Sequence, residues 1–125
     1  MTITRDPLTE RVIGLAIEVH RTLGPGLLES VYEDCICHEL RAHGIEHQRR
    51  LSLPVSYKGL QLEAGFRVDA VVERRLVLEL KAIDQILPVH EAQLLTCMKL
   101  DNYGTGLLLN FHVALLKDGI KRMVL

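Results

Sequence analysis

One short segment near the middle of the chain constrains the fold most. Residues 76–83, Leu-Val-Leu-Glu-Leu-Lys-Ala-Ile, are apolar everywhere except at Glu79 and Lys81. A strand that is apolar on both faces is typical of the centre of a sheet whose two sides are both covered. The segment therefore predicts a layered fold. It also places two charged side chains where charges are rarely tolerated unless they are paired or ligated.

The rest of the chain supplies the helices and further strands that such a fold needs. Helical spacing of apolar residues is found over residues 8–23, 27–42 and 89–102, and strand-like runs are found over residues 48–57, 61–72, 106–111 and 120–125. Pro54 predicts an edge strand or a bulge, and Asp118-Gly119 predicts a hairpin turn. The predicted order is ααβββαββ, an α/β fold with a mixed sheet flanked by helices. We expect residues 1–125 to form a single domain.

Composition and charge exclude several functional classes. The chain is 48% hydrophobic and 25% charged, which is the balance of a globular protein and not of a disordered one. A net charge of -1 argues against indiscriminate coating of nucleic acid, so any nucleic-acid contact is expected through a local patch. The apolar runs are too short to cross a bilayer, and the N-terminus lacks the apolar core of a signal peptide. We therefore expect a cytoplasmic protein that has no membrane partner.

The turn around Arg74 brings charged side chains from two strands together. Side chains alternate between the faces of a strand, so Arg67 and Asp69 share one face before the turn, and Glu79 and Lys81 share one after it. With the turn centred on Arg74, Asp69 lies opposite Glu79 and Arg67 lies opposite Lys81. Directly opposed carboxylates repel each other at a Cβ separation of about 5 Å, unless another group compensates for the repulsion.

A divalent cation is one such group, because Mg²⁺ prefers oxygen ligands and commonly takes one or two carboxylates plus water. Lys81 would place an ammonium beside that cation, which is a suitable arrangement for hydrolysing a phosphodiester. Glu29 is a further unexplained carboxylate, since its helical spacing to Tyr32 places it on the apolar side of the second helix. The alternative interpretation is a solvated strand face on which Asp69 pairs with Arg67 or Lys81.

Four motifs, in order, resemble a known family. They are Gly26-Leu-Leu-Glu29-Ser-Val-Tyr32, Val68-Asp69 with Glu79-Leu-Lys81, His90-Glu-Ala-Gln93-Leu-Leu, and Gly106-Leu-Leu-Leu-Asn110-Phe111. Together they resemble the GxxExxY proteins of the PD-(D/E)xK nuclease superfamily, over nearly the whole chain from about Leu8 onward. The resemblance implies a restriction-endonuclease-like core. At Cys97 the chain departs from the aromatic residue that the resemblance leads us to expect.

The resemblance also implies roles for five residues. Glu29, Asp69 and Glu79 would be ligands of Mg²⁺ or Mn²⁺, Lys81 would be the catalytic lysine, and Gln93 would be an auxiliary polar group. We therefore expect a metal-dependent nuclease whose partner is nucleic acid, DNA in preference to RNA. One alternative is a catalytically inactive module on the same fold that binds nucleic acid or protein. Another is a structural subunit, because the apolar closing strands could pair across a homodimer.

Three further features have two interpretations each. The Tyr32 hydroxyl either contacts a site carboxylate or belongs to the core, and His90 either faces the metal site or caps its helix. Scattered basic residues such as Arg49-Arg50 either contact phosphate or form a solvated surface.

Overall fold

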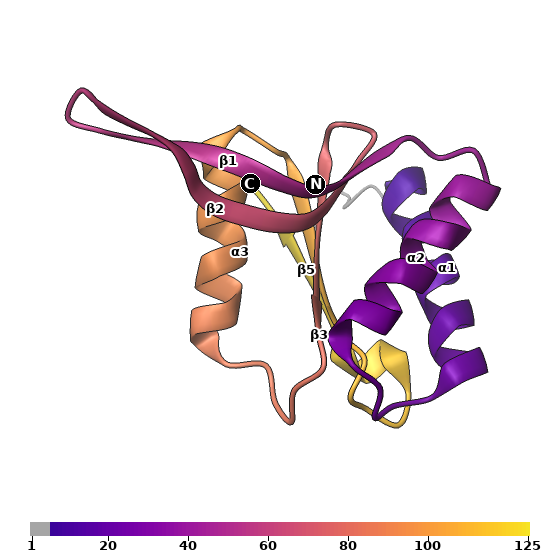
Figure 1. The fold of residues 1–125 in the computed structure, drawn as a ribbon. Coiled ribbons are helices and arrows are strands. Elements are labelled where there is room, and N and C mark those ends of the chain that lie inside the picture. The colour runs from indigo at the N-terminus through magenta and orange to yellow at the C-terminus, as the bar shows by residue number, and fades with distance from the viewer. Residues whose placement is uncertain (1–5) are drawn as a thin grey trace, which may run out of the picture.

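The computed structural model describes residues 6–125, and this part of the chain forms a sheet covered by helices on both sides (Figure 1). The elements run α1 (Pro7–Leu23), α2 (Glu29–Ala42), β1 (His47–Tyr57), β2 (Leu60–Val72), β3 (Leu76–Lys81), α3 (Pro88–Leu100), β4 (Thr105–Asn110), the 3-10 helix η1 (Leu116–Gly119) and β5 (Ile120–Val124). The predicted order ααβββαββ is confirmed. The one addition is η1, which forms at Asp118-Gly119, where a simple hairpin turn was predicted.

The sheet is mixed, with the strands in the order β1-β2-β3-β4-β5. All neighbouring strands are antiparallel except β3 and β4, which run parallel because α3 crosses over between them. This arrangement puts β3 in the middle, and all its residues from Leu76 to Leu80 are buried. The prediction of a central, doubly covered strand is therefore confirmed.

The β2–β3 register follows the predicted turn, but the ladder is short. Ala70 pairs with Leu78, and the two pairs nearer the turn keep the same register. The described ladder ends there, so the predicted pairings of Asp69 with Glu79 and of Arg67 with Lys81 do not form. The Asp69 carboxylate instead accepts a hydrogen bond from the backbone N–H of Leu80, at 2.8 Å.

β2 leaves β3 because the strand turns at Asp69. Val72 and Ala70 pack toward α1 and α2, whereas Val68 packs toward α3, although simple alternation puts all three on one face. The partner strand bends at the same point, since Arg50 has a φ of 51° between the pairs that join β1 to β2. Beyond this bend β1 and β2 continue as a long hairpin that projects past α3 (Figure 1).

Pro54 lies on the edge strand β1, at a register shift between Leu53 and Val55, so both parts of the prediction for this proline are confirmed. Gly65 faces this bulge. A Cβ atom added at Gly65 would lie 2.1 Å from Cγ2 of Val55, so the strands approach too closely there for a side chain.

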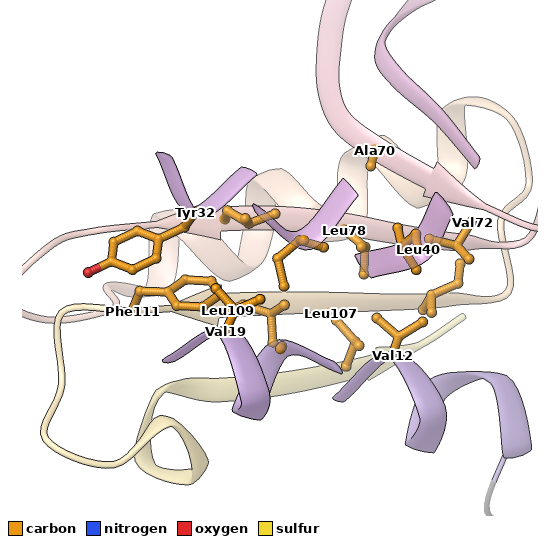
Figure 2. Close-up of a cluster of buried hydrophobic side chains, with 14 of the residues drawn as sticks. Val12, Val19, Tyr32, Leu40, Ala70, Val72, Leu78, Leu107, Leu109 and Phe111 are labelled. Atoms are coloured by element: carbon orange, nitrogen blue, oxygen red, sulfur yellow. The ribbon is translucent and has the colours of Figure 1, made fainter. Parts of the chain in front are cut away.

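Two hydrophobic cores fix the sheet between the helices. One core lies between α1, α2 and the sheet, and Figure 2 shows Tyr32 of α2 and Phe111, just after β4, at one end of it. Their rings are stacked with centroids 4.4 Å apart. The other core packs Leu94, Cys97 and Met98 of α3 against the opposite face. Cys97 thus fills a core position at which the resemblance leads us to expect an aromatic side chain.

None of the helices in the described range 6–125 is long and apolar enough to span a bilayer. The prediction that the N-terminus lacks a signal core falls mainly on residues 1–5, which lie outside that range.

Candidate active site

A single pocket brings together the five residues singled out from the sequence. It has a volume of about 270 Å³ and is formed by α2, β2, β3, α3 and β4. Its lining comprises Glu29, Phe66, Arg67, Asp69, Glu79, Lys81, His90, Gln93, Leu94 and Leu108. Phe66, Arg67 and Asp69 all reach it because β2 turns at this point. Strict alternation would have sent Phe66 to the other face.

Glu79 is the most buried carboxylate of the pocket, with 8% of its surface exposed. Burial raises its pKa to about 8, and the negative charge of Asp69 adds to the rise, while Lys81 opposes it. Its Oε1 atom is buried and has no hydrogen-bond partner among the described residues. A buried carboxylate oxygen without a partner is costly, so Glu79 is held where a cation would stabilise it.

Asp69 lies beside Glu79 and is held by the backbone of β3. Its Oδ2 atom accepts the Leu80 N–H, which fixes the carboxylate against the strand that carries Glu79 and Lys81. Burial raises the pKa of Asp69, and the positive charge of Lys81 lowers it. The ammonium group therefore acts on the same carboxylates that burial disfavours.

Glu29 reaches the pocket differently from the way its spacing predicted. It is exposed, and the prediction that it is held against the apolar side of the second helix is wrong. The reason is that α2 begins at Glu29, so its side chain lies at the end of the helix instead of on the packed face. Partial burial and the charge of Asp69 nevertheless raise its pKa, and Lys81 lowers it.

Tyr32 positions the start of α2. Its hydroxyl donates to the carbonyl of Gly24 at 2.6 Å and accepts the N–H of Leu27 at 3.1 Å. The hydroxyl is therefore engaged by the α1–α2 loop and not by a site carboxylate. Tyr32 is a core residue that holds the loop leading into Glu29.

Asn110 is a positioning residue that the sequence did not single out for this role. It is buried beside Lys81 in the β3–β4 register. Its Oδ1 accepts the N–H groups of Ile83 and His112, at 3.1 and 3.2 Å, and its Nδ2 donates to the Ile83 carbonyl at 2.9 Å. These bonds fix the chain just after Lys81. A buried asparagine at the end of an apolar strand was the available signal.

α3 contributes Gln93 and His90. Gln93 is exposed at the edge of the pocket, one helical turn after His90. Nδ1 of His90 accepts the N–H of Leu87 at 2.8 Å, so this histidine does cap its helix. It also lines the pocket, so the two interpretations of His90 are compatible.

The basic pair on β1 is engaged with α2 rather than free for a ligand. Glu33, one turn after Glu29, is buried and accepts from Arg49 Nη2 at 2.6 Å and from Arg50 Nε at 3.2 Å. Arg49 also pairs with Asp34. The pairs tie α2 to β1 at the bend that carries the positive φ of Arg50. Glu33 gave no distinct sequence signal, because an acidic residue on a helix usually faces solvent.

The donor chemistry of the pocket fits a hard divalent cation. Three carboxylates line it, each with a raised pKa, and one buried oxygen of Glu79 lacks a partner among the described residues. Within residues 6–125, however, no three acidic, histidine or cysteine side chains converge closely enough to form a ready metal cluster. Asp69 and Glu79 are the candidates for direct ligands, with Glu29 at the margin.

Comparison with known proteins identifies the family. The chain matches the PD-(D/E)XK nuclease superfamily over residues 6–123. Because this match spans nearly the whole chain, the protein belongs to that superfamily. The mixed sheet flanked by helices is consistent with its fold. Searches of curated proteins and of solved structures found no match to this chain.

Proposed function

We propose that the protein is a divalent-metal-dependent nuclease that hydrolyses phosphodiester bonds of nucleic acid. The observation that carries the proposal is that Asp69, Glu79 and Lys81, which resemble the motif for which its superfamily is named, line one pocket together with Glu29 and Gln93. These residues come from four separate elements, so the pocket does not arise from a single charged strand face.

Each group has a distinct task in this proposal. Asp69 and Glu79 would hold Mg²⁺ or Mn²⁺, and Glu29 would supply a further carboxylate at the mouth of the pocket. When bound there, the cation would supply positive charge to polarise the scissile phosphodiester and to lower the pKa of a water molecule. Lys81 orients the attacking water and offsets the charge that develops on the phosphoryl oxygens. Gln93 orients polar groups at the edge of the pocket through its amide.

Within the superfamily we propose that the chain is a GxxExxY protein, on the strength of Gly26, Glu29 and Tyr32 at the name-giving spacing. The roles of Tyr32 and Glu29 support this: the tyrosine holds the loop that leads into the glutamate. We further propose DNA in preference to RNA as the substrate.

The test is a cleavage assay on DNA and RNA with Mg²⁺, with Mn²⁺ and with EDTA. Asp69→Asn removes a carboxylate that would hold the cation, and Lys81→Met removes the ammonium that offsets charge on the phosphoryl oxygens, so each should lower cleavage by about a thousandfold. Circular dichroism should show an unchanged fold. Asp84→Asn is the matched control, since its side chain is 99% exposed and lies outside the pocket.

Full activity of Asp69→Asn would refute the assignment of the site, and cleavage that persists in EDTA would refute the need for a metal. A wild type that shifts nucleic acid in a gel but cleaves none under any condition would identify a binding module instead.

A further inference from the structure

Arg67 is a cation of the pocket whose guanidinium makes no hydrogen bond to the described part of the chain. It is exposed, lines the pocket two residues before Asp69, and its side chain forms no hydrogen bond or close ion pair with any residue of the described range, although its charge lowers the pKa of Asp69. Lys81 acts on all three carboxylates, whereas Arg67 acts on Asp69 and not on Glu29 or Glu79. The Arg67 guanidinium is therefore available to an anion from outside the chain.

His90 presents a hydrogen-bond donor to the same pocket. Because its Nδ1 atom accepts the Leu87 N–H at 2.8 Å, the proton of the neutral ring must reside on Nε2. The cap thus selects the tautomer, and Nε2–H has no protein partner among residues 6–125. The ring lines the pocket from α3, whereas Arg67 lines it from β2.

The charge of the pocket makes such donors necessary. A nucleic-acid phosphate approaching Glu29, Asp69 and Glu79 would meet carboxylates that already repel one another. In the proposed function a cation and Lys81 would offset those charges and act at the reacting phosphate, so neither of them holds the neighbouring backbone. A guanidinium matches two phosphate oxygens at once, and a neutral imidazole N–H adds a directed hydrogen bond without competing for the metal.

We propose that Arg67 and His90 form a phosphate-binding pair that holds the nucleic-acid backbone at the pocket, beside the bond to be cleaved. The proposal rests on the proposed nuclease function and specifies how the substrate is held. Both are positioning residues: they fix the substrate phosphate, while the carboxylates and Lys81 act at the reacting atoms.

The first test is binding of a short fluorescein-labelled DNA duplex, followed by anisotropy over a range of salt concentrations, with Ca²⁺ in place of Mg²⁺. Arg67→Ala should weaken binding about tenfold, because one charge-assisted contact is lost. It should also reduce the slope of log Kd against log salt by about 0.9, the value for one phosphate contact. Arg74→Ala is the control, since that exposed arginine pairs with Glu46 at the β2–β3 turn.

The second test separates the donor of His90 from its helix cap. His90→Gln keeps an acceptor for the Leu87 N–H and also an N–H donor, whereas His90→Glu keeps the acceptor alone. Both should unfold at the wild-type temperature. The glutamine variant should bind nearly as well as wild type, and the glutamate variant about tenfold more weakly. Ala92→Glu, exposed on α3 and outside the pocket, controls for the added charge.

The outcomes distinguish this proposal from the proposed function. If Arg67→Ala binds as well as Arg74→Ala while the wild type cleaves DNA, the phosphate-binding pair is overturned and the nuclease function stands. If His90→Glu binds no worse than Ala92→Glu, the role of His90 is overturned. A wild type that neither binds nor cleaves nucleic acid would overturn both proposals.

Discussion

Without a cation, the buried Glu79 carboxylate should make the stability of the protein depend on pH. Its pKa is raised from 4.5 to about 8, first by burial and then by the charge of Asp69. Between these two values the folded protein holds a proton that the unfolded chain releases. Folding is therefore favoured at the acidic end of this window, and the contribution of Glu79 is lost as the pH rises through it. Burial also raises the pKa of Asp69 and of Glu29, which gives the same sign.

Replacing Glu79 by glutamine should remove most of this dependence. In EDTA, the free energy of unfolding of the wild type should fall as the pH rises from about 5.5 to about 8, whereas that of Glu79→Gln should fall less. The variant should be the more stable of the two at the alkaline end, because no charge is buried. Urea unfolding at the two pH values measures this. Glu63→Gln, exposed on the β1–β2 hairpin, should behave as the wild type does, and an unchanged slope in Glu79→Gln would contradict the argument.

At the scale of the elements, the periodicity of apolar residues predicted which helices and strands form, but it did not predict where β2 turns. The order of helices and strands, the central β3 and the β2–β3 register all followed from apolar spacing and from the turn at Arg74. The turn of β2 at Asp69 did not, because it depends on β1 bending at Arg50, which pairs with Glu33 on a helix distant in sequence. Local alternation contains no information about such long-range ion pairs.

The exposure of Glu29 was missed for a related reason. Helical spacing gives the face of a residue but not the residue at which a helix begins. The structure begins α2 at Glu29, where the α1–α2 loop is held by the Tyr32 hydroxyl. A carboxylate at the first position of a helix is also favoured by the helix dipole.

Asn110, at the end of β4, holds the chain that follows Lys81 of β3, so its replacement should affect the site. Asn110→Leu would remove three hydrogen bonds and leave the Ile83 backbone without its partners. We expect a loss of about 3 kcal/mol in the free energy of unfolding, measured by urea titration. Cleavage should also fall at temperatures where the variant is folded, because the chain after Lys81 is no longer fixed. Gln85→Leu, on the exposed loop that follows, is the control; equal losses in the two variants would contradict this role for Asn110.

At the scale of the whole molecule, the pocket exists because two cores hold its walls independently. The core beneath α1 and α2 fixes the element that begins with Glu29, and the core beneath α3 fixes the one that carries His90 and Gln93. β3 lies between the cores and contributes Glu79 and Lys81 to the pocket. A ligand that bridges these walls should therefore stabilise the entire fold, since it binds the folded chain and not the unfolded one.

A divalent cation should accordingly raise the melting temperature. With Mg²⁺ or Mn²⁺ at about ten times its Kd the gain is about 1.4 kcal/mol, which corresponds to roughly 3–6 °C for a domain of this size. The gain should be larger near pH 8 than near pH 6, because protons and the cation compete for the Glu79 carboxylate, whose pKa is about 8 in the metal-free protein. Differential scanning fluorimetry with each cation at both pH values measures the gain.

Asp69→Asn and Glu79→Gln should lose this gain in melting temperature, and Glu63→Gln should keep it. A wild-type shift that is the same at both pH values, or that survives Glu79→Gln, would mean that the cation binds elsewhere, because only a site built on this buried carboxylate couples metal binding to its proton.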